Sequence, residues 1–555
     1  MAPRKRAKTI VRTERMTKST RATKYFSIVP ETNGKKRKLA HEPESPRRKK
    51  LRTAPLSQGA LNQLPTLRSD APSALFVHGG GEAGQLGLGP DVLEEISRPR
   101  LHQKYQELGV GIQCLAAGGM HSLLVDSRGR VWSWGANEQF ALGRGTENVV
   151  GTDADELEST PATVSGLDGF IAVSATAGDC ISIVISNEGQ LRAWGAFRRE
   201  DGSLGFDDSS DRSVQPQSYP SLSKEKVCQV KCGANHVLAL TADGHVFTWG
   251  FGARGELGRK EQYCTLSLKP ERLSLRNIVT IGAGSQQSFA VDSDGLVYGW
   301  GLNHMYQLGL SADRIGPDTS VFVPTLIDSL HPSLHGGARV IAIEGGEFHT
   351  LFLFDNGNVY GCGRCDEYAI GLAKDHPAMI AVHQKYEEEL PSLREGLSKK
   401  YGCPIDDPQL KRLVVDLHIR EPARIAFPPT PTEEDPAPTL PPFDQGYSST
   451  KIATISAGLR YSLACSTKGI LYAWGVGSTA QLGLGKEESV ETPVRVRSKG
   501  LKEYSAIGAD AGGQHVLVRS NPLFSRFQRF QCSCQNRCSA TRIHFAAAAA
   551  SPRTS

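Results

Sequence analysis

Hydrophobic and polar residues alternate along most of this chain in short runs, and the runs come in pairs. The segment AGGMHSLLVDSRGRVWSWG at 117–135 shows one such pair, with Gly129 in the turn between its two runs. Alternation with a period of two is typical of a half-buried strand, and two such runs around a glycine turn favour a hairpin. The pattern therefore predicts a chain built from β-hairpins.

The hairpin pattern recurs along the sequence. Further copies read AGDCISIVISNEGQLRAWG, CGANHVLALTADGHVFTWG, GAGSQQSFAVDSDGLVYGWG, GGEFHTLFLFDNGNVYGCG and AGLRYSLACSTKGILYAWG. A seventh start, AGGQHVLVRS at 511–520, has no second half, whereas LFVHGG at 75–80 looks like an isolated second half. We expect these two pieces, from opposite ends of the repeat region, to form one unit.

The length of the repeat favours a propeller. Residues 75–520, without a non-repeating insert at 373–450, leave about 53 residues for each of seven units, which fits a four-stranded blade. We expect an all-β fold, a seven-bladed β-propeller closed by an N-terminal strand in the last blade, with disordered tails. A solenoid is the alternative architecture. The propeller is preferred because radial closure leaves few exposed strand edges.

A tryptophan near the end of the second run is followed by a Leu-Gly or Ile-Gly pair in most copies, and no copy has a Trp-Asp pair. Over 75–520 apart from the insert, this pattern resembles the regulator-of-chromosome-condensation family. The resemblance implies a seven-bladed propeller, and the best-known members are guanine nucleotide exchange factors for the small GTPase Ran. Other members include ubiquitin-ligase modules and scaffolds, so the fold alone does not settle function.

The second unit is two residues longer than the others at one place. The interval between the two repeated glycines is 8 in six units, for example from Gly135 to Gly143, but it is 10 from Gly195 to Gly205. The extra length falls in AFRREDGSLGF at 196–206, where Asp201-Gly202 favours a tight turn. Ordinary variation in loop length and a projecting hairpin are both open from the residues alone.

The resemblance to Ran exchange factors gives this insertion a role, because those proteins carry a β-wedge here that pushes into the GTPase beside its nucleotide. It implies an exchange site made of Asp179, Arg199, Glu200, Asp201, Gly202, Ser203 and Leu204. It also implies partner-binding positions at Glu82, His121, Asn235 and His515. Histidines satisfied within a loop network are the alternative for His121 and His515. Asn235 stands where the family pattern has aspartate, and Phe348 where it has histidine.

Charge divides the chain into two parts. Residues 1–53 hold 18 Lys and Arg against 4 Asp and Glu, a net of +14, and the chain total of +6 leaves −8 for the remainder. We expect residues 1–74 to be a disordered basic arm with a bipartite nuclear import signal read by importin. The signal would comprise Lys35, Lys36, Arg37, Lys38, Arg47, Arg48, Lys49 and Lys50. The same charges would contact DNA phosphates or histones of chromatin, with a solvated tail as the alternative.

The remaining segments carry weaker signals. The insert at 373–450 joins a helix-compatible stretch to a proline-rich one and is either a binding element or disordered. Residues 521–555 lie outside the repeat and include the low-complexity run Ala546 to Ala550, so they are expected to be disordered or the product of a wrong gene model. Cys532, Cys534, Cys538 and His544 have poor spacing for a zinc site. Cys362 and Cys365 form a lone CxxC pair that chance explains. No metal or cofactor is expected.

These observations predict a nuclear protein, a monomer away from membranes, that acts without covalent chemistry. The twelve cysteines without a regular framework favour a reducing compartment. There is no GxxxxGK[ST] loop, so we do not expect the chain to bind nucleotide itself. The main hypothesis is a Ran exchange factor on chromatin that supports nucleocytoplasmic transport and mitosis. The alternative is a propeller scaffold or chromatin-binding module without exchange activity. No room is left for a ubiquitin-ligase domain.

Overall fold

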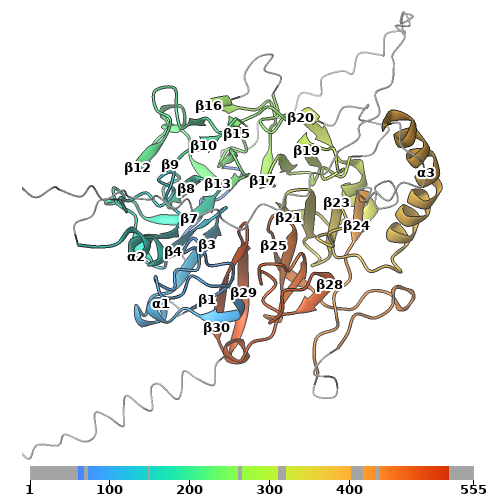
Figure 1. Ribbon diagram of the computed structural model, residues 1–555. Coiled ribbons are helices and arrows are strands. Elements are labelled where there is room, and N and C mark those ends of the chain that lie inside the picture. The colour runs from blue at the N-terminus through green and yellow to red at the C-terminus, as the bar shows by residue number, and fades with distance from the viewer. Residues whose placement is uncertain are drawn as a thin grey trace, which may run out of the picture. The chain divides into compact units, whose positions relative to one another are not determined.

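The computed structural model describes residues 60–67, 73–147, 151–199, 201–259, 266–310, 320–401, 417–432, 435 and 438–523. Within these residues the strands form five separate four-stranded sheets, one eight-stranded sheet and one two-stranded hairpin. The eight-stranded sheet consists of two antiparallel groups of four, which a single parallel pair, Ala283 with Glu344, joins. The fold is all-β and propeller-like (Figure 1).

The first groups along the chain share one order, in which each strand pairs with the next. They are β3 (Ile112–Ala117), β4 (His121–Asp126), β5 (Val131–Gly135) and β6 (Ala162–Thr163); β7 (Ala172–Ala177), β8 (Ile181–Ser186), β9 (Leu191–Gly195) and β12 (Ser213–Gln217); β13 (Val227–Cys232), β14 (His236–Thr241), β15 (Val246–Phe251) and β16 (Leu266–Arg272); and β17 (Ile278–Ala283), β18 (Gln287–Asp292), β19 (Val297–Leu302) and β20 (Ser320–Leu326). The short hairpin is β10 (Phe197–Arg198) with β11 (Leu204–Gly205).

The later groups follow the same order until the last. They are β21 (Val340–Gly345), β22 (His349–Phe354), β23 (Val359–Arg364) and β24 (His418–Arg424); β25 (Ile452–Ala457), β26 (Tyr461–Ser466), β27 (Leu471–Gly475) and β28 (Val490–Arg495); and β29 (Tyr504–Ala511), β30 (His515–Pro522), β1 (Ala74–Gly79) and β2 (Ile96–Leu101). The α-helices are α1 (Gln103–Glu107), α2 (Ala154–Ser159) and α3 (Pro377–Tyr401), and single 3₁₀ turns lie at Pro220–Leu222, Asp328–Leu330, Pro332–His335, Phe443–Gln445 and Gly500–Glu503.

The two ends of the repeat region meet in one sheet. β1 pairs antiparallel with β30, from Ala74 opposite Ser520 to Gly79 opposite His515. The first strands of the groups also contact one another in chain order, and the last of them, β29, contacts β3. Figure 1 shows β1 and β30 side by side although they lie at opposite ends of the coloured chain. The half-units at 75–80 and 511–520 therefore belong to one sheet.

Each hairpin turn is fixed by a glycine and a polar side chain. In the first, Gly129 has a φ of 79° and its N–H donates to the Asp126 carbonyl at 2.9 Å. The Asp126 carboxylate also accepts from the N–H groups of Arg128 and Arg130. A side chain with a Cβ resists this left-handed conformation, which explains the glycine in the turn. We call the end of the sheets with these turns the turn face, and the opposite end the loop face.

The repeated tryptophans join neighbouring sheets. All five are fully buried, and four of them donate from Nε1 to the carbonyl that precedes the Leu-Gly or Ile-Gly pair of the previous unit: Trp134 to Gln85, Trp194 to Ala141, Trp300 to Glu256 and Trp474 to Ala369, at 2.8–2.9 Å. The glycine of that pair lies against the indole, where a Cβ would clash. Burial of so large a ring stabilises the contact between sheets, and the hydrogen bond fixes its orientation.

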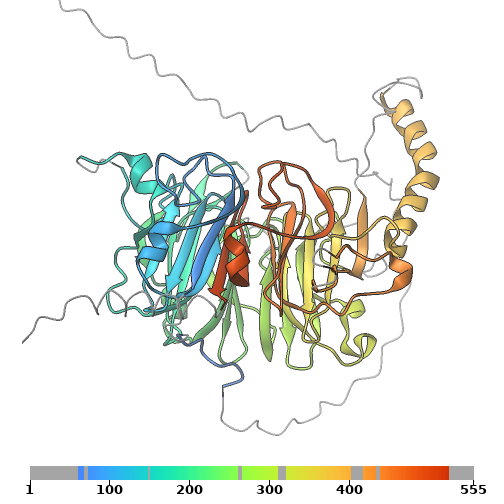
Figure 2. The same ribbon diagram turned by 90° about the horizontal axis from the view of Figure 1, so that it is seen from below.

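The segment 373–450 differs from the insert that the sequence suggests, because β24 lies within it and completes the sheet of β21, β22 and β23. Pro422 interrupts β24, which is an edge strand where proline is tolerated. α3 lies beside β24, outside the sheet (Figures 1 and 2). None of the helices in the described residues has the length and apolar character needed to span a bilayer.

Residues 60–67, which the sequence assigns to the arm, contact the turn face. Asn62 donates from its backbone N–H to the Ala242 carbonyl at 2.9 Å and from its side chain to the Ile278 carbonyl at 2.9 Å. The Thr66 carbonyl accepts from the Gln113 side chain at 3.0 Å. Asn62 thus connects the sheet of β13 to the sheet of β17. Residues 1–59 lie outside the described part of the chain.

Candidate functional site

The loops that follow the first strands are bonded to one another across the loop face. The links run from Gly513 N–H to Gly118, Gly119 to Gly178, Asp179 to Ala234, Ala234 to Ser285, Ser285 to Gly346 and Glu347 to Leu459, at 2.8–3.1 Å. Each link joins the backbones of two neighbouring four-stranded groups, so the loops hold fixed positions relative to one another. Side chains carried by these loops are therefore presented on a rigid platform.

Asp179 and Asn235 occupy adjacent loops of this platform and touch. The Asn235 amide donates from Nδ2 to Asp179 Oδ2 at 3.2 Å, and its Oδ1 accepts from the backbone N–H of Arg198 at 2.7 Å. The Asp179 side chain is in contact with solvent, but protein atoms around its carboxylate displace part of its hydration. This desolvation raises the pKa of Asp179, whereas the hydrogen bond from Asn235 lowers it. Asn235 thereby links the carboxylate to the hairpin that begins at Phe197.

The expected projection is a hairpin of two short strands, β10 and β11. Phe197 pairs with Gly205 and Arg198 with Leu204, and the Arg199 N–H donates to the Ser203 carbonyl at 2.8 Å. At the tip, Gly202 has a φ of 82° and open space around its α-carbon. Asp201 is exposed and accepts from the N–H and the hydroxyl of Ser203, which lowers its pKa. Glu200 lies outside the described residues.

The hairpin also changes the packing below it. Among the repeated tryptophans in the described residues, only Trp249 does not donate a hydrogen bond from Nε1 to a carbonyl of the preceding unit. In its unit that carbonyl belongs to Ser203, which bonds instead across the hairpin. Tyr219 fills the space, with its ring stacked on Phe206 at 5.7 Å and packed edge-on against Trp249 at 5.3 Å. The insertion is accommodated by a separate aromatic cluster.

The loop histidines are buried rather than exposed. Each bonds through Nε2 to a serine of the next sheet: His121 to Ser182, His236 to Ser288, His349 to Ser462 and His515 to Ser122, at 2.8–2.9 Å. His121 is 1% exposed and His515 0% exposed, so neither ring reaches a partner directly. Burial lowers the pKa of His121 to about 4 and that of His515 to about 3. The geometry corresponds to the loop-network alternative.

Glu82 and Phe348, the two remaining loop positions that the sequence singled out, differ in exposure. Glu82 is exposed in the loop after β1, on the loop face. Phe348 is half-buried, with its ring edge-on to His304 at 5.2 Å and the Arg364 guanidinium 5.9 Å from its centre. Phe348 therefore holds a packing position at the loop face instead of offering a titratable group.

An ionic cluster beside Phe348 has no counterpart in the sequence-based site. Glu347 holds the same loop position as Asp179, and Arg460 lies 3.9 Å from its carboxylate and 3.2 Å from Glu367. Burial raises the pKa of Glu347, Arg460 lowers it, and Asp179 contributes a further increase. Comparison of Gly-Asp at 178–179 with Gly-Glu at 346–347 in the aligned repeats is the signal that finds this residue.

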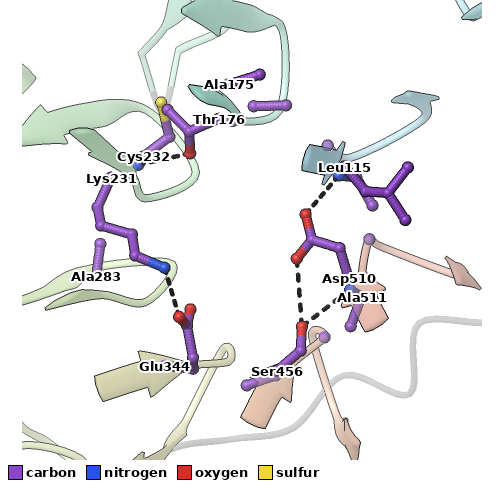
Figure 3. A pocket seen from close by; sticks show the side chains of 18 of the residues that line it. Leu115, Ala175, Thr176, Lys231, Cys232, Ala283, Glu344, Ser456, Asp510 and Ala511 are labelled. Atoms are coloured by element: carbon purple, nitrogen blue, oxygen red, sulfur yellow. Dashed lines mark hydrogen bonds and ion pairs between the residues drawn. The ribbon is translucent and has the colours of Figure 1, made fainter. Parts of the chain in front are cut away.

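A polar cavity of about 470 Å³ lies among the first strands (Figure 3). Lys231 forms an ion pair with Glu344, and both side chains point into the cavity. Asp510 accepts from the Ala117 N–H at 2.9 Å and from the Ser456 hydroxyl at 3.3 Å. Burial, with the negative charge of Glu344, raises the pKa of Asp510 to about 7.

Other expected site residues fall elsewhere. The basic residues Lys35 to Lys38 and Arg47 to Lys50, and the tail from 524 on, lie outside the described residues. Cys362 takes the place of a repeated tryptophan, with its thiol 3.6 Å from the Gln307 carbonyl. Both Cys362 and Cys365 are buried, which raises the pKa of each thiol. The described residues contain no group of three His, Cys, Asp or Glu side chains placed to hold a metal ion.

Repeated hairpin sheets with linked loops at one end define a propeller-like repeat protein. Residues 74–518 match the family model for the RCC1-like domain, and the chain belongs to this family. Protein pim1 of Schizosaccharomyces pombe is 33% identical over 481 residues, which cover 84% of this chain and 78% of pim1. The guanine nucleotide exchange factor SRM1 of Saccharomyces cerevisiae is 32% identical over 469 residues, covering 80% of this chain and 86% of SRM1.

Solved structures agree with this membership. The crystal structure of Prp20p from Saccharomyces cerevisiae, described with its binding to Gsp1p and histones, has a TM-score of 0.66 and 28% identity, and covers 84% of this chain and 96% of that chain. The structure of yeast RCC1 (Prp20) bound to Kap60 has a TM-score of 0.68 and 27% identity, and covers 89% of this chain and 100% of that chain.

Proposed function

We propose that this protein is a guanine nucleotide exchange factor that promotes GDP release and GTP loading on Ran. The observation that carries the proposal is the hairpin of β10 and β11, which stands beside Asp179 and Asn235 on the loop face. Membership of the RCC1-like family and the likeness to SRM1, a guanine nucleotide exchange factor, support it. The loop face is the proposed contact surface for the GTPase.

The hairpin would act as a wedge. A small GTPase holds its nucleotide with backbone N–H groups of the phosphate loop and with Mg²⁺. A protein that binds the nucleotide-free state more tightly weakens nucleotide affinity by the same factor, because the coupling is reciprocal. The exposed tip residues Asp201, Gly202 and Ser203 are held by hydrogen bonds to one another and across the base of the hairpin, so the tip is preorganised to occupy space that the closed nucleotide site requires. Exchange needs no covalent step.

Asp179 and Glu347 would make the electrostatic contacts with the GTPase during exchange. Both carboxylates lie on the loop face, and both have raised pKa values because protein surrounds them. A basic group of the GTPase, freed when the phosphates leave, would pair with such a carboxylate and favour its ionised form. Asp179 is the better placed of the two because Asn235 connects it to the hairpin, whereas Arg460 already neutralises Glu347 in part. Glu82 would contact the GTPase at the edge of this surface.

We also propose the number of blades and the limits of the propeller within the chain. Residues 75–520 would form seven blades, with β1 latching the last blade, and 1–74 and 521–555 would lie outside the propeller. The pairing of β1 with β30 and the contact of β29 with β3 support the latch. Within 373–450, only the residues that flank β24 would be a true insert.

The basic arm would place this activity on chromatin in the nucleus. We propose that Lys35 to Lys38 and Arg47 to Lys50 bind an importin and, after import, histones or DNA phosphates. The relatives described with histones and with Kap60 support such partners. Deletion of 1–53 should abolish nuclear accumulation and the salt-sensitive part of DNA binding. Exchange on free Ran should persist, and unchanged localisation and chromatin retention would count against the arm.

The decisive experiment is release of fluorescent GDP from Ran. Catalytic amounts of the full chain should accelerate release by several orders of magnitude in the presence of excess GTP. A second small GTPase, such as Ras, serves as the control substrate, and release of its GDP should not be accelerated if the effect is specific for Ran. Release from Ran that stays at the intrinsic rate with stoichiometric protein would reject the proposal and leave the scaffold alternative.

A further inference from the structure

A second cavity, of about 740 Å³, lies at the turn-face ends of the last two sheets, far from the loop-face site. Six cationic side chains line it: Arg98 and Arg100 from β2, Arg495 from β28, and Arg497, Lys499 and Lys502 from the connection between β28 and β29. The chain from residue 54 onward carries a net charge of −8, so this concentration of positive charge stands out from the acidic body.

Four of the six cations of this cavity have no carboxylate partner among the described residues. In the part of the chain that the structure describes, Arg100, Arg495, Lys499 and Lys502 form no ion pair with a carboxylate. Arg98 donates from Nη1 to the Arg497 carbonyl at 2.7 Å, which holds β2 and the connection together. Like charges held this close repel one another, and an anion bound between them removes that repulsion.

Arg495 is a partly buried cation in the lining of the cavity. Its side chain is half-buried, unlike the exposed Lys499 and Lys502, and burial together with the neighbouring Arg497 lowers its pKa. Partial burial of an arginine without a carboxylate partner is costly, and proteins use it where an anion must be recognised. The planar guanidinium suits phosphate, which accepts two parallel hydrogen bonds from it.

We propose that this cavity binds a compact organic polyphosphate, a small soluble molecule that carries several closely spaced phosphate groups. Six cations exceed what one phosphate needs, and the volume lies within the range of small-molecule sites. Leu101, Leu471 and Leu501 provide apolar contacts for the carbon framework of such a ligand. The backbone of duplex DNA offers the same phosphates, but a rigid convex cylinder does not reach a half-buried group such as Arg495.

The test uses the full chain and inositol hexakisphosphate as the probe, with binding measured by calorimetry at physiological salt. Lys499→Glu/Lys502→Glu, and separately Arg495→Gln, should each weaken binding at least tenfold. The matched control Lys224→Glu/Lys269→Glu makes the same change of charge at two exposed lysines outside the cavity, one before β13 and one in β16, and should bind like the parent. Circular dichroism checks that each variant is folded.

Two further arms separate the phosphate sources. Inorganic phosphate should compete only weakly, and the affinity for a short duplex DNA, which we assign to the arm, should be the same in the cavity and control variants. Equal hexakisphosphate affinity in the cavity and control variants would overturn the proposal. So would loss of duplex affinity in the cavity variants without hexakisphosphate binding, since this would identify a DNA surface. None of these outcomes depends on exchange activity.

Discussion

Asn235 donates to the carboxylate of Asp179 at 3.2 Å while its carbonyl oxygen accepts from the backbone of the β10–β11 hairpin. An asparagine can do both at once because its amide has a donor and an acceptor. An aspartate at this position can accept from the hairpin but cannot donate to a second carboxylate when it is ionised. The departure from the family pattern at Asn235 therefore adds a hydrogen bond to Asp179 that an ionised aspartate would not make.

This contact predicts the effect of Asn235→Asp. The substitution keeps an acceptor for the Arg198 N–H but replaces the donor to Asp179 with a second carboxylate. The two carboxylates should then share a proton or repel one another, which disturbs the link between Asp179 and the hairpin. We expect catalysed release of GDP from Ran to slow by about tenfold, with a stronger dependence on pH. Asp179→Asn in the same background should recover part of the loss, as a double-mutant cycle would measure. Full activity of Asn235→Asp would show that the link has no role in exchange.

The hairpin tip gives a second prediction. Removal of Asp201 and Gly202 restores the interval of eight found in the other units and deletes only exposed residues of the turn. The melting temperature should stay within a few degrees of the parent, because Tyr219 and Phe206 pack the space beneath the hairpin. Exchange on Ran should fall by at least a hundredfold, more than binding of Ran measured by pull-down.

A control for the deletion lies in the adjacent turn. Asp208→Ala changes an exposed charge next to β11 without shortening the hairpin and should retain parental exchange. If the shortened protein keeps both its melting temperature and its exchange rate, the extra residues are ordinary loop variation and the wedge mechanism loses its support.

Asp510 predicts how stability depends on pH. Its pKa is about 7 in the folded protein and near 3.8 when unfolded, so between these values the folded state retains a proton that the unfolded state has lost. Stability from this group therefore falls as the pH rises from about 4 to 7, with a slope of about 1.4 kcal/mol per pH unit at most. Asp510→Asn should flatten that part of the profile in thermal unfolding measured at a series of pH values. The exposed Asp168→Asn should leave the profile unchanged, and equal slopes in parent and Asp510→Asn would contradict the assignment.

The buried histidines act in the opposite direction. His236 has a pKa of about 4 when folded, well below its ordinary value of 6.5, because burial disfavours the charged ring. Its contribution to stability is present above pH 6.5 and is lost as the pH falls toward 4, because only the unfolded state takes up the proton. His236→Gln should cost about 1 kcal/mol at neutral pH through the lost bond to Ser288, and should reduce the acid sensitivity. A variant that unfolds at the same pH as the parent would refute this account.

Features that repeat along the chain could be predicted from the sequence, whereas contacts between residues of different sheets could not. The hairpins, their turn glycines and the Trp-Gly pattern were readable because each is set by residues a few positions apart. The Asn235 to Asp179 contact joins residues on different sheets, and only the packing of those sheets brings them together. The strand β24 could not be predicted because α3 separates it along the chain from its partner β23. Its sequence, HIREPAR, also has charges and a proline where a strand usually alternates polar and apolar residues. For His121 and His515 the sequence left partner binding and a loop network both open, because their serine partners lie in the next unit.

The pairing of Ala74 with Ser520 has a consequence for how the chain comes into being. β1 is among the first described strands to leave the ribosome, yet its partner β30 follows more than 400 residues later. Until β30 has been synthesised, β1 can pair only with β2, and the open edge of β1, with the apolar Phe76 beside it, invites aggregation. Completion of the fold is therefore a slow, long-range event.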